Sequence, residues 1–124
     1  MVYLITGKSG AGKTHYAKAC AQEFENLHVP VWLIDGDVFR NKTENQDYSD
    51  AGRFRNLISA ALQAQHAEKM GYIVLVSFIA PKKDWRDQMR KHWFQSRVIY
   101  LPGGQLWEGT EYEQPTEEEL WPQE

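Results

Sequence analysis

Short apolar runs alternate with longer segments of helical periodicity along most of the chain. Strands alternating with helices are typical of parallel crossovers, so the pattern predicts an α/β domain with a mostly parallel sheet and helices on both of its faces. The strands are expected at residues 2–6, 29–34, 72–78 and 97–101. The helices are expected at residues 14–24, 53–70 and 84–95.

The expected helices carry apolar stripes that can face the sheet. In the last helix Trp85, Met89 and Trp93 are spaced four residues apart, and we interpret them as a packing face, not a cofactor site. Gly71 follows the middle helix as its stop signal. The stripe of this middle helix is expected at Phe54, Leu57, Ile58, Ala61, Leu62 and Gln65.

Charge is the one compositional feature that changes this picture. The 124 residues suffice for one compact domain and carry a net charge of -3. Residues 111–124 hold six Glu and no Lys or Arg, so residues 1–110 carry 14 basic and 11 acidic side chains. We predict a mildly basic domain over residues 1–110 and a solvated acidic tail over 111–124. This excess suits a phosphate-rich small molecule and is too weak to indicate duplex nucleic acid.

Neither a disulfide nor a membrane segment is expected. Cys20 is the single cysteine, so it has no intrachain partner, and its apolar neighbours favour a packed thiol over a reactive one. No apolar run approaches the roughly 20 residues of a membrane span, and Met1 leads directly into a strand without a signal peptide. We therefore predict a cytoplasmic protein without membrane association.

Residues 7–14, GKSGAGKT, fit the phosphate-loop pattern G-x-x-x-x-G-K-[ST] at every fixed position. Glycines let backbone N–H groups turn toward phosphate oxygens, and a helix N-terminus adds partial positive charge. Lys13 would reach the β- and γ-phosphates, and Thr14 would ligate Mg²⁺. A glycine-rich turn with a coincidental lysine is the alternative, but we predict ATP and Mg²⁺ as ligands. The expected nucleotide-binding residues are Gly7, Ser9, Gly10, Ala11, Gly12, Lys13, Thr14 and His15.

Two carboxylates, Asp35 and Asp37, follow the second expected strand. In a parallel sheet next to the phosphate loop both would face the phosphates and Mg²⁺. One could hold a metal-bound water while the other orients or deprotonates an acceptor hydroxyl; a turn aspartate and a helix cap are the alternative. The nearby Arg40 indicates either a salt bridge or an anionic substrate.

A second group of polar residues opens the following helix. Arg53 and Asn56 lie three residues apart and share a helix face. Because guanidinium groups suit phosphate or sulfate, Arg40 and Arg53 could converge on a second anion. Solvated surface arginines are the alternative interpretation.

With these residues in view, the chain resembles the adenylyl-sulfate kinase family, whose members phosphorylate the 3'-hydroxyl of adenosine 5'-phosphosulfate. DGDVFR (35–40) matches the family's DGDxxR, YSDAGRFRN (48–56) is similar to its aromatic-Ser-x-x-x-Arg-x-x-Asn segment, and SFIAP (77–81) to its SFISP. The motifs follow the phosphate loop in the family's order, so the resemblance covers residues 1 to about 100. It implies a P-loop NTPase fold, Mg²⁺ and ATP, and a small-molecule nucleotide acceptor. A homodimer is one option, since family members are often dimers.

The resemblance also implies roles for single residues. Asp37 would be the magnesium or acceptor-hydroxyl carboxylate, supported by Asp35, with Lys13 as the third catalytic residue and Thr14 as the other metal ligand. These roles depend on the family match and not on spacing alone.

On the acceptor side, Arg40, Arg53 and Asn56 would hold the phosphosulfate and ribose. The backbone around Ile79 would line the adenine pocket, with Tyr48 stacking on the base. The resemblance makes Trp107, from WEGTEYEQP (107–115), the candidate for the second stacking ring, although it could equally anchor the tail. The expected acceptor-binding residues are thus Arg40, Tyr48, Arg53, Asn56, Ile79 and Trp107.

The match fails between Leu101 and Trp107, where the family carries a basic lid helix and this chain has only PGGQL. A basic lid stabilises the transferring phosphoryl group and excludes water. Its loss predicts a slower enzyme, a helper residue from a partner subunit, or a different acceptor. Ala80 replaces a family serine, so no hydroxyl chemistry is assigned there. A kinase of another nucleotide or nucleic-acid hydroxyl and a catalytically weak nucleotide-binding module remain open.

Overall fold

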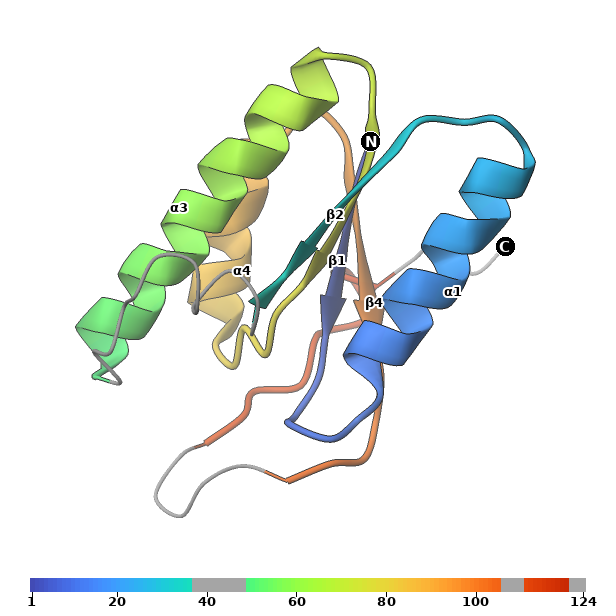
Figure 1. Ribbon diagram of the computed structural model, residues 1–124. Coiled ribbons are helices and arrows are strands. Elements are labelled where there is room, and N and C mark those ends of the chain that lie inside the picture. Colours follow the sequence, from blue (N-terminus) through green and yellow to red (C-terminus); the bar gives the residue numbers. More distant parts are fainter. Residues whose placement is uncertain (37–48, 106–110, 121–124) are drawn as a thin grey trace.

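One parallel sheet of four strands, in the order β2-β3-β1-β4, forms the centre of the protein in a computed structural model that describes residues 1–36, 49–105 and 111–120. Helix α1 covers one face, and α3 and α4 cover the other (Figure 1). The predicted α/β arrangement with helices on both faces is confirmed. The strands are β1 (Val2–Thr6), β2 (Val31–Asp35), β3 (Ile73–Ser77) and β4 (Ser96–Tyr100). The described helices are α1 (Lys13–Asn26), α3 (Asp50–Lys69) and α4 (Lys83–Arg90).

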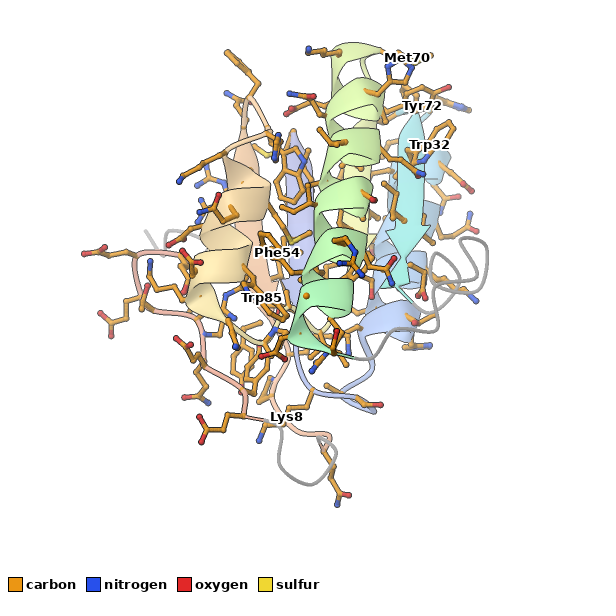
Figure 2. All side chains as sticks on the ribbon, turned by 90° about the vertical axis from the view of Figure 1, so that its left-hand side faces the viewer. Lys8, Trp32, Phe54, Met70, Tyr72 and Trp85 are labelled. Atoms are coloured by element: carbon orange, nitrogen blue, oxygen red, sulfur yellow. The ribbon has the colours of Figure 1, made fainter. Side chains whose placement is uncertain are left out.

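The two faces of the sheet bury separate clusters because side chains alternate along each strand. In β1, Val2 and Leu4 point into the larger cluster beneath α3 and α4, whereas Ile5 joins the smaller cluster beneath α1. Figure 2 shows Phe54 and Trp85 between α3 and α4, where their ring centroids lie 5.7 Å apart. Helices α3 and α4 thus pack together as one layer on this face of the sheet.

The buried face of α3 differs from the predicted stripe. Leu57 and Ala61 are buried as predicted, but Leu62 is 47% exposed. Much of the buried face consists of alanines, because short side chains let a helix lie close to a sheet. These alanines are Ala60, Ala61, Ala64 and Ala67.

Helix α4 ends at Arg90, before the predicted end at residue 95. Beyond it, the amides of Phe94 and Gln95 donate to the Glu68 carboxylate at 2.8 and 3.1 Å instead of to helical carbonyls. The indole of Trp93 is nevertheless buried, as predicted, and donates to the Ala61 carbonyl at 2.9 Å. The chain must leave the helix here because β4 starts at Ser96.

Residues 111–120 pack on the domain, so the prediction of a solvated tail is wrong for part of the stretch. Glu119 is 4% exposed and accepts from the Arg86 guanidinium at 2.9 Å. Leu120 forms a parallel bridge with Val98 of β4. The sequence pattern suggested solvation because buried glutamates are rare, but Arg86 supplies the buried partner. A domain division at residue 110 stays a prediction.

Two smaller expectations concern Cys20 and the membrane. The Cys20 thiol is half-buried and packs against the cluster beneath α1, as predicted. Among the described helices, none combines the length and the apolar character that crossing a bilayer requires.

Candidate nucleotide-binding site

The candidate site lies where the strands end. The N-terminal ends of α1 and α3 both point to this end of the sheet, although the helices lie on opposite faces (Figure 1). A cavity of about 490 Å³ opens here between the phosphate loop and the ends of β2 and β3. Of the sequence-predicted residues it brings together Ser9, Gly10, Gly12, Lys13, Thr14, His15, Asp35 and Ile79.

The phosphate loop is shaped by its own backbone. Gly12 precedes α1 with φ of 92°, a left-handed conformation that favours glycine, and no side chain caps the helix. The amide of Ala11 donates to the Lys8 carbonyl at 3.1 Å, and the Lys13 ammonium donates to the same carbonyl at 2.9 Å. Gly7 is buried at the start of the loop, against the Leu101 carbonyl. The N-terminus of α1 and Lys13 thus both line the cavity at the phosphate loop, where a helix N-terminus favours an anion.

One hydrogen bond links the two halves of the cavity. The Thr14 hydroxyl at the start of α1 donates to Oδ2 of Asp35 at the end of β2, at 2.6 Å. A hydroxyl and a carboxylate are oxygen groups of the type that Mg²⁺ prefers. No group of three or more His, Cys, Asp or Glu in the described ranges could hold a metal by itself.

Sequence reasoning missed several residues of the cavity wall. Lys18 follows Thr14 by one helical turn, so the four-residue spacing could have identified it. Gly36, Ser77 and Phe78 also line the cavity; two of them belong to the SFIAP motif, whose contribution we expected only from the backbone near Ile79. Lys18 adds a second ammonium group next to the phosphate loop.

Arg53, one of the residues predicted to bind an acceptor, lies beside this cavity. The Ser49 hydroxyl caps α3 by accepting from the Gly52 amide at 3.2 Å, which fixes the first turn that carries Arg53. Arg53 lines a small pocket of about 20 Å³ together with Phe78 and Ile79, which also line the phosphate-loop cavity. Its guanidinium lies 3.9 Å from the Asp50 carboxylate.

The remaining predicted acceptor and catalytic residues are either buried in α3 or not described by the structure. Asn56 is buried in α3, and among the described residues no hydrogen bond reaches its side chain. Asp37, Arg40, Tyr48 and Trp107 lie outside the described residues.

The segment that replaces the expected lid contacts the phosphate loop itself. The Gln105 amide donates to the Ser9 carbonyl at 2.8 Å, and the two residues form an antiparallel bridge. A Cβ on Gly104 would lie 2.4 Å from the Ser9 carbonyl oxygen, so the two backbones touch. This short connection therefore acts as a wall of the loop, which the sequence did not reveal.

A larger cavity, of about 570 Å³, lies elsewhere, between α1 and β4. Its walls are mainly apolar and aromatic, including Tyr3, Phe24 and Ile99. It contains neither the phosphate loop nor a strand-end carboxylate. We therefore assign the candidate site to the smaller cavity.

Comparison with known sequences gives a family match over most of the chain. Residues 1–101 match the family described as adenylylsulphate kinase. A probable adenylyl-sulfate kinase of Archaeoglobus fulgidus is 36% identical over 91 residues, which cover 73% of this chain and 59% of the relative. An adenylyl-sulfate kinase of Burkholderia ambifaria is 37% identical over 91 residues, covering 72% and 50%. The chain thus spans little more than half the length of these relatives.

Solved structures agree with this match. An APS kinase of Mycobacterium tuberculosis in complex with AMPPNP and APS is 25% identical, with a TM-score of 0.77 over 81% of this chain and 61% of that one. A hexameric APS kinase from Thiobacillus denitrificans is 27% identical, with a TM-score of 0.78 over 92% of this chain and 23% of that one. The predicted P-loop NTPase fold is confirmed, and the chain belongs to the adenylylsulphate kinase family.

Proposed function

We propose that the protein is a kinase that transfers the γ-phosphoryl group of Mg-ATP to the 3'-hydroxyl of adenosine 5'-phosphosulfate. The observation that carries this proposal is the 2.6 Å hydrogen bond from Thr14 to Asp35, which joins the phosphate loop to a carboxylate at the next strand end. It occurs in a chain whose family match covers both residues. A phosphate loop with an adjacent carboxylate is the arrangement that phosphoryl transfer requires.

Positioning and electrostatics supply most of the catalysis in such a reaction. Lys13 and the loop amides would hold the β- and γ-phosphates and neutralise the charge that develops there. The bond from the γ-phosphorus to the bridging oxygen of ADP breaks as the acceptor oxygen bonds to that phosphorus. The hydroxyl proton passes to a carboxylate, and we assign this role to Asp37.

Magnesium would be held by the Thr14 hydroxyl, with Asp35 binding it through water. When bound, the ion supplies positive charge to the phosphate oxygens. The hydrogen bond between the two side chains supports this division of labour, since it directs the Asp35 carboxylate toward the position that Thr14 faces. Asp37 is then left for the acceptor hydroxyl.

For the acceptor, we propose that Arg53 and Arg40 bind the phosphosulfate and that Asn56 contacts the ribose. Tyr48 and Trp107 would stack on the adenine, with the backbone at Ile79 as the side wall. The support is that the pocket of Arg53 shares Phe78 and Ile79 with the phosphate-loop cavity. A homodimer stays a proposal as well.

Coupled ADP release with and without adenosine 5'-phosphosulfate tests the proposal. Lys13→Ala should lower kcat/KM at least about 100-fold, because it removes a charge that acts on the transferring group. Lys69→Ala, in an exposed position near the end of α3, is the matched control and should retain activity. Absence of acceptor-dependent turnover in the wild type, or an unaffected Lys13→Ala variant, would contradict the proposal.

A nucleotide-binding module without efficient catalysis is the second candidate. One observation favours it: the segment at the position of the lid is short, and its backbone at Gly104 and Gln105 touches the phosphate loop at Ser9. Such a module would be stabilised by about 2.7 kcal/mol at Mg-ATP concentrations 100 times the Kd, without acceptor-dependent turnover.

Stabilisation by nucleoside monophosphates or oligonucleotides, and not by adenosine 5'-phosphosulfate, would instead indicate a kinase of another acceptor.

A further inference from the structure

Three consecutive backbone carbonyls follow β3, and each accepts a hydrogen bond from another part of the chain. Because these carbonyls belong to neither a helix nor a strand, they depend on donors that the tertiary fold brings to them. The turn at residues 79–81 is therefore set by tertiary contacts. The Thr6 hydroxyl donates to the Ile79 carbonyl at 2.5 Å, the Arg86 guanidinium donates to the Ala80 carbonyl at 2.7 Å, and the Glu113 amide donates to the Pro81 carbonyl at 2.7 Å.

The turn needs these contacts because its backbone is unusual. Ala80 has φ of 44°, a left-handed conformation that is unfavourable for a residue with a Cβ. Such conformations persist where the surrounding structure determines them. The Ala80 side chain is also buried, at 1% exposure. Loss of the outside donors would favour a different path for this stretch of backbone.

Tyr112 controls the first of the three donors. Its hydroxyl lies 2.8 Å from Oγ1 of Thr6. Thr6 has one hydroxyl proton, and the Ile79 carbonyl can only accept, so Tyr112 must donate to Thr6 while Thr6 donates to Ile79. Burial raises the pKa of the Tyr112 hydroxyl, which keeps its proton in place at neutral pH. The chain of hydrogen bonds thus runs in one direction, from residue 112 to the turn.

Glu119 controls the second donor. Arg86 is fully buried, and its Nε and Nη2 atoms donate to the two carboxylate oxygens of Glu119 at 2.9 and 3.4 Å, while Nη1 remains for Ala80. The guanidinium also lies over the Tyr112 ring, 5.8 Å from its centroid. Since Glu113 itself supplies the third donor, the stretch 112–119 governs all three contacts.

The position of the turn matters because it separates two pockets. Phe78 and Ile79 line both the phosphate-loop cavity and the pocket of Arg53. The phosphate-loop side is tied independently, since the amide of Phe78 donates to the Ile5 carbonyl at 3.1 Å and Gln105 donates to Ser9. The wall of the Arg53 pocket instead depends on residues 79–81. Ala80 and Pro81 line the Arg53 pocket but not the phosphate-loop cavity.

We infer that residues 111–120 are a positioning element for acceptor binding, with Tyr112 and Glu119 as its positioning residues. Through the turn at 79–81 they hold the wall of the Arg53 pocket, without touching the phosphates of the donor. The inference rests on the proposed function, because it takes the Arg53 pocket as part of the acceptor site. It assigns to this acidic stretch a role in specificity.

Tyr112→Phe tests this inference, and Tyr100→Phe is its matched control. The rings of Tyr100 and Tyr112 are stacked with their centroids 5.9 Å apart, and each variant removes one hydroxyl group. The Tyr100 hydroxyl accepts from the Gln114 side chain and does not reach the turn. In calorimetric titrations of the full chain, Tyr112→Phe should weaken adenosine 5'-phosphosulfate about 3- to 10-fold, the loss expected for one hydrogen bond, and Mg-ATP less than about 2-fold. Tyr100→Phe should change both affinities less than about 2-fold.

A second readout does not depend on ligands. Amide hydrogen exchange at residues 79 and 80 should accelerate in Tyr112→Phe and not in Tyr100→Phe, because only the first variant loosens the turn. Glu119→Gln should give the same pattern more strongly if it folds. Equal weakening of both ligands, or equal effects of the two tyrosine variants, would overturn the inference. If the wild-type chain binds neither ligand, the proposed function is contradicted. The positioning role is tested independently of ligands, because unchanged amide hydrogen exchange in Tyr112→Phe would overturn it.

Discussion

At the residue scale, the phosphate loop depends on backbone contacts that a single methyl group would break. Gly103 and Gly104 are adjacent, and both have positive φ, of 97° and 72°. A Cβ on Gly103 would meet no atom within 4 Å, whereas one on Gly104 would lie 2.4 Å from the Ser9 carbonyl oxygen and 2.9 Å from the Ala11 nitrogen. An alanine at Gly103 would therefore test the cost of the left-handed backbone alone, whereas an alanine at Gly104 would add a clash with the phosphate loop.

We predict that Gly104→Ala weakens Mg-ATP binding at least about 10-fold, because the phosphate loop must move to admit the methyl group. Gly103→Ala should lose only about 1 kcal/mol of folding free energy, from its left-handed conformation, and retain ATP affinity. Calorimetric titration with Mg-ATP, together with thermal unfolding, measures both effects. Equal affinities of the two variants would show that the connection does not shape the loop.

A second prediction at this scale concerns Asp35. If Asp35 binds magnesium through water, Asp35→Asn should weaken Mg-ATP about 10-fold or more and leave the binding of ATP in the presence of EDTA nearly unchanged. Asp87→Asn, which removes a surface carboxylate paired with Lys83, is the matched control. Titrations with and without the metal distinguish this result from a general loss of nucleotide affinity, which would argue against a metal role.

At the element scale, the helices show what a hydrophobic pattern can and cannot reveal. The strand positions and the existence of three helices followed from period and spacing, since apolar runs and stripes reflect burial directly. The stripe of α3 was partly misjudged, because large apolar residues such as Leu62 carry more weight in a pattern than the alanines that pack closest to the sheet. The early end of α4 depends on Glu68, a partner distant in sequence.

The alanine face of α3 leads to a stability prediction. Ala64 is fully buried, so Ala64→Leu must displace the sheet or the helix and should destabilise the fold by about 1–3 kcal/mol. Gln63→Leu places the same leucine side chain at an exposed neighbouring position and should change stability by less than about 0.5 kcal/mol. Urea unfolding of both variants measures the difference. Comparable losses would mean that α3 does not pack closely through this position.

At the scale of the whole molecule, contacts between distant segments complete both the fold and the candidate site. The phosphate loop and Asp35 could be identified from sequence because strand ends and local motifs place them. The burial of Glu119 could not, since a glutamate is read as exposed until Arg86 is known to face it. The same holds for Gly104, whose contact with Ser9 exists only in three dimensions.

Glu68 joins three parts of the molecule and offers the last test. Its side chain is 8% exposed, lies 2.9 Å from the Met1 ammonium and accepts from the amides of Phe94 and Gln95. Burial alone would raise the pKa of the Glu68 carboxyl, but these donors together outweigh it and lower the pKa below its ordinary value. The carboxylate thus ties the end of α3 to the chain start and to the turn before β4.

The pKa of Glu68 is lower in the folded protein than in the unfolded chain. On acidification the unfolded chain therefore binds more protons, and the contribution of Glu68 to the free energy of unfolding is lost. This contribution is complete above the ordinary glutamate pKa of about 4.3 and disappears as the pH falls through the lowered value. Glu68→Gln should therefore be less stable than wild type by about 2 kcal/mol at pH 7, with a gap that narrows below pH of about 4. Urea unfolding from pH 7 to 3 measures the gap, and Glu25→Gln, at an exposed position of α1, controls for net charge. A gap that stays constant or widens with acid would mean that the three donors do not favour the charged form of Glu68.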